Sequence, residues 1–412
     1  MYSQDVLDDF AALSAIGATP GGGVERQAAS EADGEARRWL VEWLTRHGFA
    51  ITVDRVGNVF GAVEFVPGAP YVLIGSHLDS QPTAGRFDGA YGVLAAAHAA
   101  RRIVEDVAAG VVTPRFNVAV VDWFNEEGSR FTPSIMGSSV YAGMISADAV
   151  LATRDLAGTT VEEALGAIGF LGNGTPPTAA AYAEIHIEQG WVLERMGVDI
   201  GLVESNWAAR KYEITVHGAQ GHTGATVMAD RQDALVGAAR IVCAARDVVD
   251  EFPEGALLTA VGRLTVHPNS PVVVPGEVRL SLDVRSADAD LVEQAHALLL
   301  ERFAAIGRQT AVEVEVVRSS LRHARPFPAE GVDLAETVAK EAGATTHRML
   351  TMAGHDAIPM NTLVPTVLLF VPSVDGVSHN ERELTHDEDL LRGVDVLSRV
   401  CARLVEGALA GS

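Results

Sequence analysis

The pattern of apolar and polar positions along the first third of the chain predicts both helices and strands, as in an α/β fold. Ser30 can cap a helix that ends near Gly48, and the apolar positions between them recur at helical spacing. An alanine-rich stretch over 91–107 predicts a mostly buried helix. Short apolar runs bounded by turn residues predict strands. These runs cover 51–53, 59–63, 71–75 and 116–123.

The middle of the chain is organised differently, because two helical patterns separate four strand patterns. The order of predicted elements is β-α-β-β-α-β, which is the ferredoxin-like arrangement. These elements cover 211–217, 230–249, 257–267, 277–285, 288–306 and 311–317. We expect a mixed-sheet catalytic domain built from residues 1–207 and 322–412, with residues 208–321 inserted as a ferredoxin-like domain. After the insertion, the pattern predicts a helix over 333–342, a strand over 366–371 and a long helix over 387–409.

Composition narrows the classes of function. A chain of 412 residues is long for one core and favours two domains. The net charge of −23, from 31 Lys and Arg against 54 Asp and Glu, disfavours nucleic-acid binding. Cys243 and Cys401 are too few for a disulfide scaffold. No apolar run approaches the ~20 residues of a membrane span, and the first residues do not resemble a signal peptide, so we expect a cytoplasmic enzyme.

Side chains that can bind metals occur in five short motifs. Three imidazoles and two carboxylates could hold two divalent metals, with Asp88 as the bridge. These residues are His77, Asp88, Glu127, His186 and His379. Glu126 is left to act as a base that takes a proton from water and passes it to a leaving nitrogen. Nitrogen and oxygen ligands without thiolate fit zinc, manganese, cobalt or nickel, so the set predicts metal-assisted hydrolysis of an amide-like bond.

Each motif also has a simpler interpretation when it is taken alone. His77 follows an apolar strand, and Asp79 can accept its second N–H, but a polar turn with a hydrogen-bonded histidine would have the same sequence. Asp88 precedes a helix, where a carboxylate is favoured as a cap. The adjacent glutamates could lie on the surface, and the remaining histidines could be non-ligands. The combination, rather than any one motif, therefore supports a metal centre.

Three stretches resemble the hydantoinase/carbamoylase family of amidases, which belongs to the aminoacylase- and carboxypeptidase-like dinuclear metallopeptidase superfamily. They are Gly85-Arg86-Phe87-Asp88-Gly89, Asn125-Glu126-Glu127-Gly128-Ser129-Arg130-Phe131 and His186-Ile187-Glu188-Gln189-Gly190. The resemblance extends over nearly the whole chain, and the family includes N-carbamoyl-L-amino acid hydrolases, allantoate amidohydrolases and β-ureidopropionases. It implies that one metal is held by His77 and His186 and the other by Glu127 and His379, with Asp88 bridging and Glu126 as the base.

The same resemblance implies roles in substrate binding and assembly. The inserted domain corresponds to a lid and dimerisation domain, which implies a homodimer. His222 matches a lid histidine that reaches a substrate or oxyanion in the partner's site, although its motif alone is also typical of a turn. Arg285 matches an arginine that binds a substrate carboxylate, and a structural salt bridge is the alternative. Gln189 and Gly354 match further substrate contacts. One local cation would attract a small anionic substrate to this acidic protein.

The chain departs from the family pattern at Val272, where the family has an asparagine that would hydrogen-bond the substrate. Asn269 could replace it if the loop is rerouted. We expect hydrolysis of a linear C–N bond in an N-carbamoyl-L-amino acid or a related ureido acid. The alternative is an N-acyl-L-amino acid deacylase or a dipeptidase that uses the same metal site. A metal-stabilised dimeric binding protein without activity is disfavoured, because all five ligands and Glu126 are present.

Overall fold

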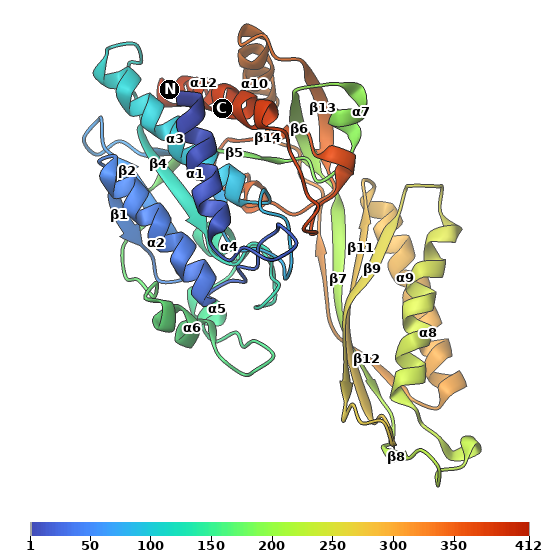
Figure 1. The fold of residues 1–412 in the computed structure, drawn as a ribbon. Helices are drawn as coiled ribbons and strands as arrows, with labels where there is room; N and C mark the ends of the chain where they lie inside the picture. The colour runs from blue at the N-terminus through green and yellow to red at the C-terminus, as the bar shows by residue number, and fades with distance from the viewer. Residues whose placement is uncertain (1, 412) are drawn as a thin grey trace. The chain divides into compact units, whose positions relative to one another are not determined.

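The chain divides into two compact units. The computed structural model describes residues 2–411. The first unit comprises Met1–Glu204 and Phe327–Ser412, and the second comprises Ser205–Pro326. The second unit is therefore inserted, along the chain, between two segments of the first (Figure 1).

The first unit is built on an eight-stranded mixed sheet with the order β1-β2-β4-β3-β5-β14-β6-β13. Strands β3, β4, β5 and β14 run parallel to one another, whereas β1, β2 and β6 pair antiparallel. The parallel strands are buried, which explains their nearly continuous apolar sequences. The strands are β1 (Ala50–Val53), β2 (Val59–Val63), β3 (Tyr71–His77), β4 (Asn117–Trp123), β5 (Ala179–Ile187), β6 (Ile200–Asn206), β13 (Thr346–Thr351) and β14 (Thr366–Val371).

Helices of the first unit pack on this sheet and on one another. Helices α3 and α12 contact each other and the central strands (Figure 1). The predicted cap of α2 is confirmed, because the Ser30 hydroxyl accepts the N–H of Asp33. Gly48, just beyond the helix, takes a φ of 85°. The helices are α1 (Tyr2–Ala15), α2 (Glu31–Arg46), α3 (Ala90–Ala108), α4 (Met136–Tyr141), α5 (Ala147–Leu151), α6 (Val161–Ile168), α7 (Val192–Met196), α10 (Ala329–Glu341), α11 (Ala357–Met360), α12 (Asp387–Val405) and the 3-10 turn η3 (Val374–Gly376).

The second unit contains a four-stranded antiparallel sheet with the order β12-β7-β11-β9. Alternate residues of β11 are buried, and helices α8 and α9 pack on each other and on the sheet. The elements are β7 (Ala208–His217), α8 (Ala234–Asp247), β9 (Leu258–His267), β11 (Glu277–Ser286), α9 (Ala289–Thr310) and β12 (Glu313–Arg322), with the short pair β8 (Gly221–His222) and β10 (Val273–Val274) and the 3-10 turns η1 (Met228–Asp230) and η2 (Val248–Glu251).

Helix α8 begins later than its sequence pattern predicts. The pattern covers 230–249, whereas the helix covers Ala234–Asp247. The Asp233 carboxylate accepts the N–H groups of Leu235 and Val236, and this cap fixes the start of the helix. The mixed α/β fold and the large mixed sheet are as predicted.

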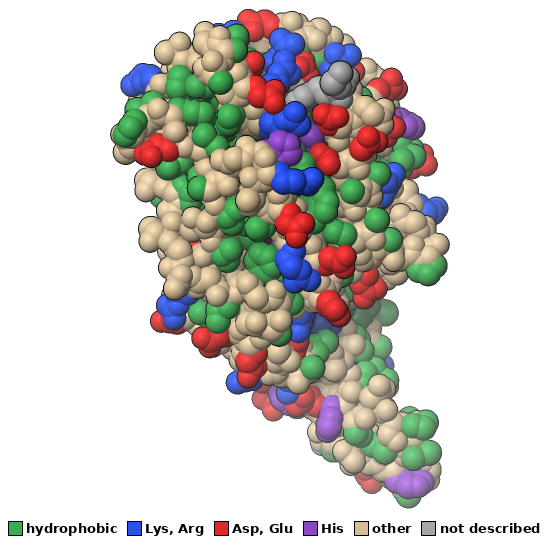
Figure 2. Space-filling view, turned by 60° about the vertical axis from the view of Figure 1, so that its left-hand side comes forward, with side chains coloured by type: hydrophobic (Ala, Val, Ile, Leu, Met, Phe, Trp, Pro, Cys, Tyr) green, Lys and Arg blue, Asp and Glu red, His purple; other side chains and the backbone are tan. Residues whose placement is uncertain are grey.

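The described helices and the charges on the surface relate to the predictions about membranes and nucleic acids. None of the described helices is long and apolar enough to cross a bilayer. Figure 2 shows Lys and Arg side chains interspersed with Asp and Glu side chains over the face in view. The expected absence of nucleic-acid binding stays a prediction.

Candidate metal centre

The five predicted ligands lie at the carboxyl ends of parallel strands in the first unit. His77 is the last residue of β3, and His186 is the next-to-last residue of β5. Asp88 lies between β3 and α3, Glu127 follows β4, and His379 follows β14. Because parallel strands end at one edge of a sheet, residues far apart in the chain converge there. The topology therefore explains how five separate motifs come together.

Two groups of metal-binding side chains share Asp88. Its Oδ1 lies 3.6 Å from His77 Nε2 and 3.0 Å from His186 Nε2. Its Oδ2 lies 3.2 Å from His379 Nε2, which is 3.4 Å from Glu127 Oε2. The candidate ligand atoms of each group lie within 4.8 Å of one another. The two oxygens of the Asp88 carboxylate thus face two different sets of candidate metal ligands.

The two groups differ in exposure. The side chains of His77, His186 and Asp88 are 2%, 1% and 3% exposed. The side chain of Glu127 is 5% exposed and that of His379 is 48% exposed, so the difference between the groups lies in His379. We call His77, Asp88 and His186 the inner group, and Asp88, Glu127 and His379 the outer group.

Backbone carbonyls orient the two inner histidines. Nδ1 of His77 lies 2.9 Å from the carbonyl oxygen of Asp79, and Nδ1 of His186 lies 2.9 Å from that of Ile187. Donation from Nδ1 leaves Nε2 of each ring as the atom that faces Asp88.

The predicted contact of the Asp79 carboxylate with His77 needs correction. Asp79 Oδ1 lies 3.7 Å from Nδ1 of that ring, which is too long for a hydrogen bond. The carboxylate instead accepts the backbone N–H groups of Glu126, at 3.0 Å, and Glu127, at 3.3 Å. Asp79 therefore joins the segment that carries His77 to the segment that carries both glutamates.

Glu126 lies beside the inner group. Its Oε2 is 3.6 Å from His77 Nε2. Burial, reinforced by the charges of Glu127 and Asp88, raises the pKa of Glu126 to about 7. A carboxyl group with that pKa can both accept and release a proton near neutral pH.

A strained turn presents the two glutamates after β4. Asn125 takes a φ of 53°, a left-handed conformation that asparagine tolerates better than most residues. Its amide donates to the carbonyl oxygens of Phe131, at 2.9 Å, and Pro133, at 3.1 Å. These bonds hold the loop that follows Glu127.

The charges of the cluster fit divalent cations. Burial raises the pKa of Glu127, and the nearby Asp88 carboxylate adds to this effect. Although burial opposes the change, the hydrogen bond to Asp88 and the charge of Glu127 raise the pKa of His379 to about 9. A divalent cation would supply the positive charge that this cluster of buried carboxylates favours. The candidate ligands offer only nitrogen and oxygen atoms, which suit divalent metals. The family resemblance implies such metals as well.

Two glutamines support the candidate ligands, and only one of them was singled out from the sequence. Gln81 Nε2 donates to Glu127 Oε2 at 2.9 Å, and its backbone N–H donates to Oε1 at 3.3 Å. Gln189 Nε2 donates to Asp88 Oδ2 at 2.8 Å and to Ser378 Oγ at 3.1 Å. The predicted contact of Gln189 with substrate stays a prediction. The position of Gln81, four residues after His77 in a ligand-bearing loop, is the signal that could have identified it.

His222 and Val272 are neighbours in the second unit. His222 pairs with Val273 across β8 and β10. Its Nδ1 accepts the N–H groups of Gly224, at 3.0 Å, and Ala225, at 3.2 Å, which places the ring proton on Nε2. The side chain of Val272 is 59% exposed, and its carbonyl accepts the N–H of Thr223 at 3.3 Å. An exposed apolar side chain therefore lies near the end of a histidine-bearing strand.

The other predicted substrate contacts lie in both units. Arg285 forms a bidentate ion pair with Asp283, through Nε at 2.8 Å and Nη2 at 2.9 Å. Asn269 takes a φ of 55° in the turn before β10. Gly354 lies in the first unit, between β13 and α11. The structural ion pair of Arg285 is present, and the substrate contacts stay predictions.

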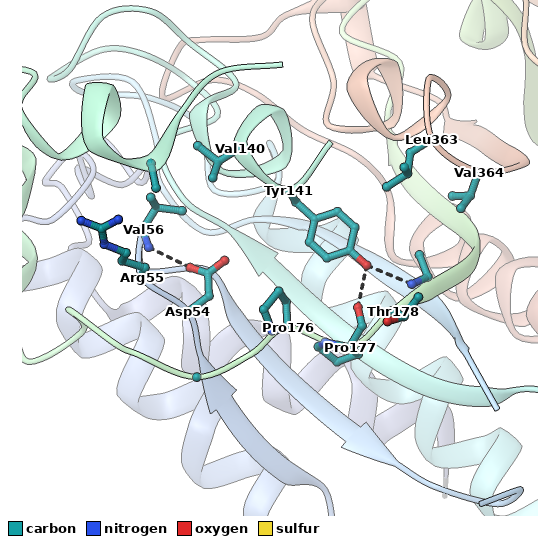
Figure 3. A pocket seen from close by; sticks show the side chains of 13 residues that line it. Asp54, Arg55, Val56, Val140, Tyr141, Pro176, Pro177, Thr178, Leu363 and Val364 are labelled. Carbon is teal, nitrogen blue, oxygen red and sulfur yellow. Dashed lines mark hydrogen bonds between the residues drawn. The ribbon is translucent and has the colours of Figure 1, made fainter. Parts of the chain in front are cut away.

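A pocket of about 520 Å³ lies at the amino ends of β5 and β14, opposite the ends that carry the predicted ligands (Figure 3). Tyr141 donates its hydroxyl to the carbonyl of Pro177 at 2.6 Å and accepts the N–H of Ala179 at 3.0 Å. Asp54 accepts the N–H groups of Val56 and Asn58, each at 2.9 Å. The hydrogen bonds of Tyr141 and Asp54 thus stabilise the walls of the pocket. None of the predicted site residues lines it.

Comparison with known proteins identifies the family. Residues 73–403 match the profile of peptidase family M20/M25/M40. An N-carbamoyl-L-amino-acid amidohydrolase of Rhizobium meliloti is 34% identical over 395 residues, covering 95% of this chain and 93% of the relative. An allantoate amidohydrolase of Bacillus subtilis is 33% identical over 407 residues, covering 97% of each.

A solved structure agrees with these sequence matches. The crystal structure of an amidase of the hydantoinase/carbamoylase family from Burkholderia vietnamiensis is 34% identical, with a TM-score of 0.93. The match covers 99% of this chain and 98% of that one. The chain therefore belongs to peptidase family M20/M25/M40 and is an amidohydrolase of the hydantoinase/carbamoylase type.

Proposed function

We propose that the protein is a dinuclear metal-dependent amidohydrolase that cleaves the linear C–N bond of an N-carbamoyl-L-amino acid or a related ureido acid. The sharing of Asp88 by the inner and outer groups is the observation that supports two metals. The relatives named as N-carbamoyl-L-amino-acid and allantoate amidohydrolases support the substrate class. Zinc, manganese, cobalt or nickel suits the nitrogen and oxygen donors.

The inner and outer groups would each hold one metal. His77, His186 and Asp88 Oδ1 would bind the first, and Glu127, His379 and Asp88 Oδ2 the second. When bound, such metals polarise a scissile carbonyl and lower the pKa of water. The residues around the donors prepare the site: backbone carbonyls aim the two inner imidazoles, and Gln81 and Gln189 orient the carboxylates.

Glu126 would move the proton during hydrolysis. Its raised pKa, of about 7, lets the carboxylate take a proton from the attacking water and then give it to the leaving nitrogen. For an N-carbamoyl substrate, the products would be the amino acid, ammonia and carbon dioxide. This role is supported by the burial of Glu126 beside His77.

The substrate contacts are proposed from the family resemblance. Arg285 would bind the carboxylate of an anionic substrate, and the pairing with Asp283 would fix the plane of its guanidinium. Gln189, Gly354 and Asn269 would complete the contacts. His222 would donate from Nε2 to the developing oxyanion, and the two backbone N–H groups that its Nδ1 accepts support this role, because they leave Nε2 as the donor.

The second unit would act as a ferredoxin-like lid and dimerisation domain. Its order of elements and its sheet order support this assignment. Strand β9 is an edge of that sheet and exposes Leu258 and Leu264, whose exposed fractions are 43% and 40%. Apolar residues on an edge strand favour pairing with a second chain, which supports a homodimer.

Val272 favours one alternative function. Where the family has an amide, this chain exposes an apolar side chain near His222. A deacylase for N-acyl-L-amino acids, or a dipeptidase, would not need the hydrogen bond of that amide. Such an enzyme would use the same metal site.

A substrate panel separates the two functions. Metal-reconstituted protein is incubated with N-carbamoyl-L-amino acids, allantoate and β-ureidopropionate, and in parallel with N-acetyl and N-formyl amino acids and dipeptides. Ammonia from a carbamoyl or ureido compound supports the proposal and identifies the substrate. Free amino acid from an acylated compound or a dipeptide, with no ammonia from the first set, would establish the alternative.

A further inference from the structure

Glu383 is a buried carboxylate that the proposed reaction does not use. It is 4% exposed and lies four residues after His379, in the segment that leads into α12. A buried carboxylate is costly unless it accepts several hydrogen bonds. The hydrogen-bond partners of Glu383 therefore show which parts of the chain it holds.

The carboxylate of Glu383 joins two segments that carry candidate ligands. Its Oε1 accepts the backbone N–H groups of Phe87, at 2.9 Å, and Asp88, at 3.1 Å. Its Oε2 accepts the hydroxyl of Ser378 at 3.1 Å. Ser378 directly precedes His379. One side chain thus ties the loop of the shared Asp88 to the turn of the outer histidine.

The loop before Asp88 is shaped to enclose this carboxylate. A Cβ atom at Gly85 would lie 2.1 Å from Glu383 Oε1 and 2.4 Å from Glu383 Cβ, closer than real Cβ atoms approach other atoms. Glycine is therefore required at this position so that the loop can approach the carboxylate. The Ser378 hydroxyl, which has one proton to donate, lies between the two carboxylates, since its Oγ is 3.3 Å from Asp88 Oδ2 and 3.1 Å from Glu383 Oε2.

The position of the His379 ring depends on the turn that carries it more than the positions of the His77 and His186 rings depend on single contacts of their strands. The inner histidines lie in buried strands, and their Nδ1 atoms bond to backbone carbonyls. The His379 side chain is 48% exposed, and its backbone takes a φ of 52°. Packing therefore constrains its ring less, and the anchoring of the turn decides where Nε2 lies.

We propose that Glu383 is a positioning residue that sets the affinity of the outer group for its metal. The inference rests on the dinuclear site proposed above. Without the carboxylate, the turn that carries His379 is released from the loop that carries Asp88. The Asp88 side chain keeps the hydrogen bond from Gln189, and His77 and His186 stay in their strands. Substitution of a residue that holds a metal ligand in place typically lowers metal affinity by about 10–100-fold. We expect a loss of that size in the outer group and a much smaller change in the inner group.

The test measures metal binding rather than activity. Metal-free wild-type protein and the variants Glu383→Ala and Glu383→Gln are titrated with Zn²⁺ in competition with a chelating indicator. The constant that disappears in His379→Ala identifies the outer group. We expect Glu383→Ala to weaken that constant by about 10–100-fold. Glu383→Gln keeps one oxygen acceptor and the shape of the side chain, so it should lie between Glu383→Ala and the wild type.

Asp54→Asn is the matched control. Asp54 is also buried and accepts two backbone N–H groups, but it lies at the pocket on the opposite ends of the strands. This variant should unfold at a lower temperature and keep both metal constants. A purely structural role of Glu383 would give the same result as this control.

Several outcomes would overturn the inference. Wild-type constants in both Glu383 variants would do so, and so would an equal loss at both groups. If Glu383→Ala does not fold, as judged by circular dichroism, Glu383→Gln alone decides. A wild-type protein that binds fewer than two ions would instead contradict the dinuclear function, whatever the Glu383 variants do.

Discussion

The inner and outer groups share Asp88 but are built from different parts of the fold. The inner histidines belong to parallel strands that are buried throughout, and backbone carbonyls next to them aim their rings. The outer donors, Glu127 and His379, lie in loops after β4 and β14, and His379 is half-exposed. The outer group therefore depends on contacts between distant loops, which Gln81 and Glu383 provide. The comparison suggests a tight inner metal and a more easily lost outer metal.

Removal of the proposed base should have the largest effect and should leave both groups intact. In Glu126→Gln the proton acceptor is lost, while the side chain keeps its size. We expect kcat to fall by at least about 10³-fold, within the usual contribution of a general base. Metal content, measured by elemental analysis, should stay at the wild-type value. A variant that turns over at the wild-type rate would contradict the proposed role of Glu126.

Substitution of one histidine from each group tests the comparison itself. His186→Ala removes a buried donor and leaves a cavity in β5, so we expect loss of the inner metal together with a lower unfolding temperature. His379→Ala removes a half-exposed side chain, so we expect loss of the outer metal with little change in stability. Metal stoichiometry and thermal unfolding of the metal-free proteins check both expectations. Equal destabilisation by the two substitutions would contradict the difference between the groups.

A histidine outside the centre gives a smaller, pH-dependent effect. Burial lowers the pKa of His98 to about 4, although Asp9 lies 3.0 Å from its Nε2 and acts in the opposite direction. The unfolded chain, with an ordinary histidine pKa of about 6.5, then binds more protons than the folded protein between pH 6.5 and 4. The free energy of unfolding should therefore fall as the pH drops through this window, by on the order of 1 kcal/mol per pH unit.

Urea unfolding of metal-free wild-type protein and His98→Gln between pH 5 and 7 measures how the free energy of unfolding depends on pH. The wild type should lose more stability on acidification than the variant, which lacks the titrating ring. Parallel losses in the two proteins would show that His98 keeps an ordinary pKa. The pKa of His379 shifts in the opposite direction, to about 9, because burial, which lowers it, is outweighed by the hydrogen bond to Asp88 and the charge of Glu127.

The sequence predicted what depends on local pattern. Four of the candidate ligands, His77, Glu127, His186 and His379, lie at or after the ends of apolar runs, and those runs are the buried parallel strands, so their clustering agrees with the predicted fold class. Helix α1 was missed although its pattern is present. Its buried residues Val6, Phe10 and Leu13 recur at helical spacing.

The supporting contacts could not be predicted, because they join segments that are remote in the chain. Glu383 and Phe87 are separated by 296 residues, and no spacing rule connects them. Asp79 was singled out correctly, but its carboxylate holds the backbone of both glutamates rather than the ring of His77. The ion pair of Arg285 with Asp283 is different, because it is a local contact between residues two positions apart, and the sequence left both this ion pair and a substrate carboxylate open as partners of the arginine.

Activity measured as a function of added metal tests the central claim most directly. Metal-free protein is titrated with manganese or zinc, and ammonia release from an N-carbamoyl-L-amino acid is followed together with bound metal. The account predicts that activity stays low after one equivalent per subunit, rises with the second and then reaches a plateau. Full activity with one equivalent, or in the presence of excess chelator, would contradict a dinuclear centre that shares Asp88.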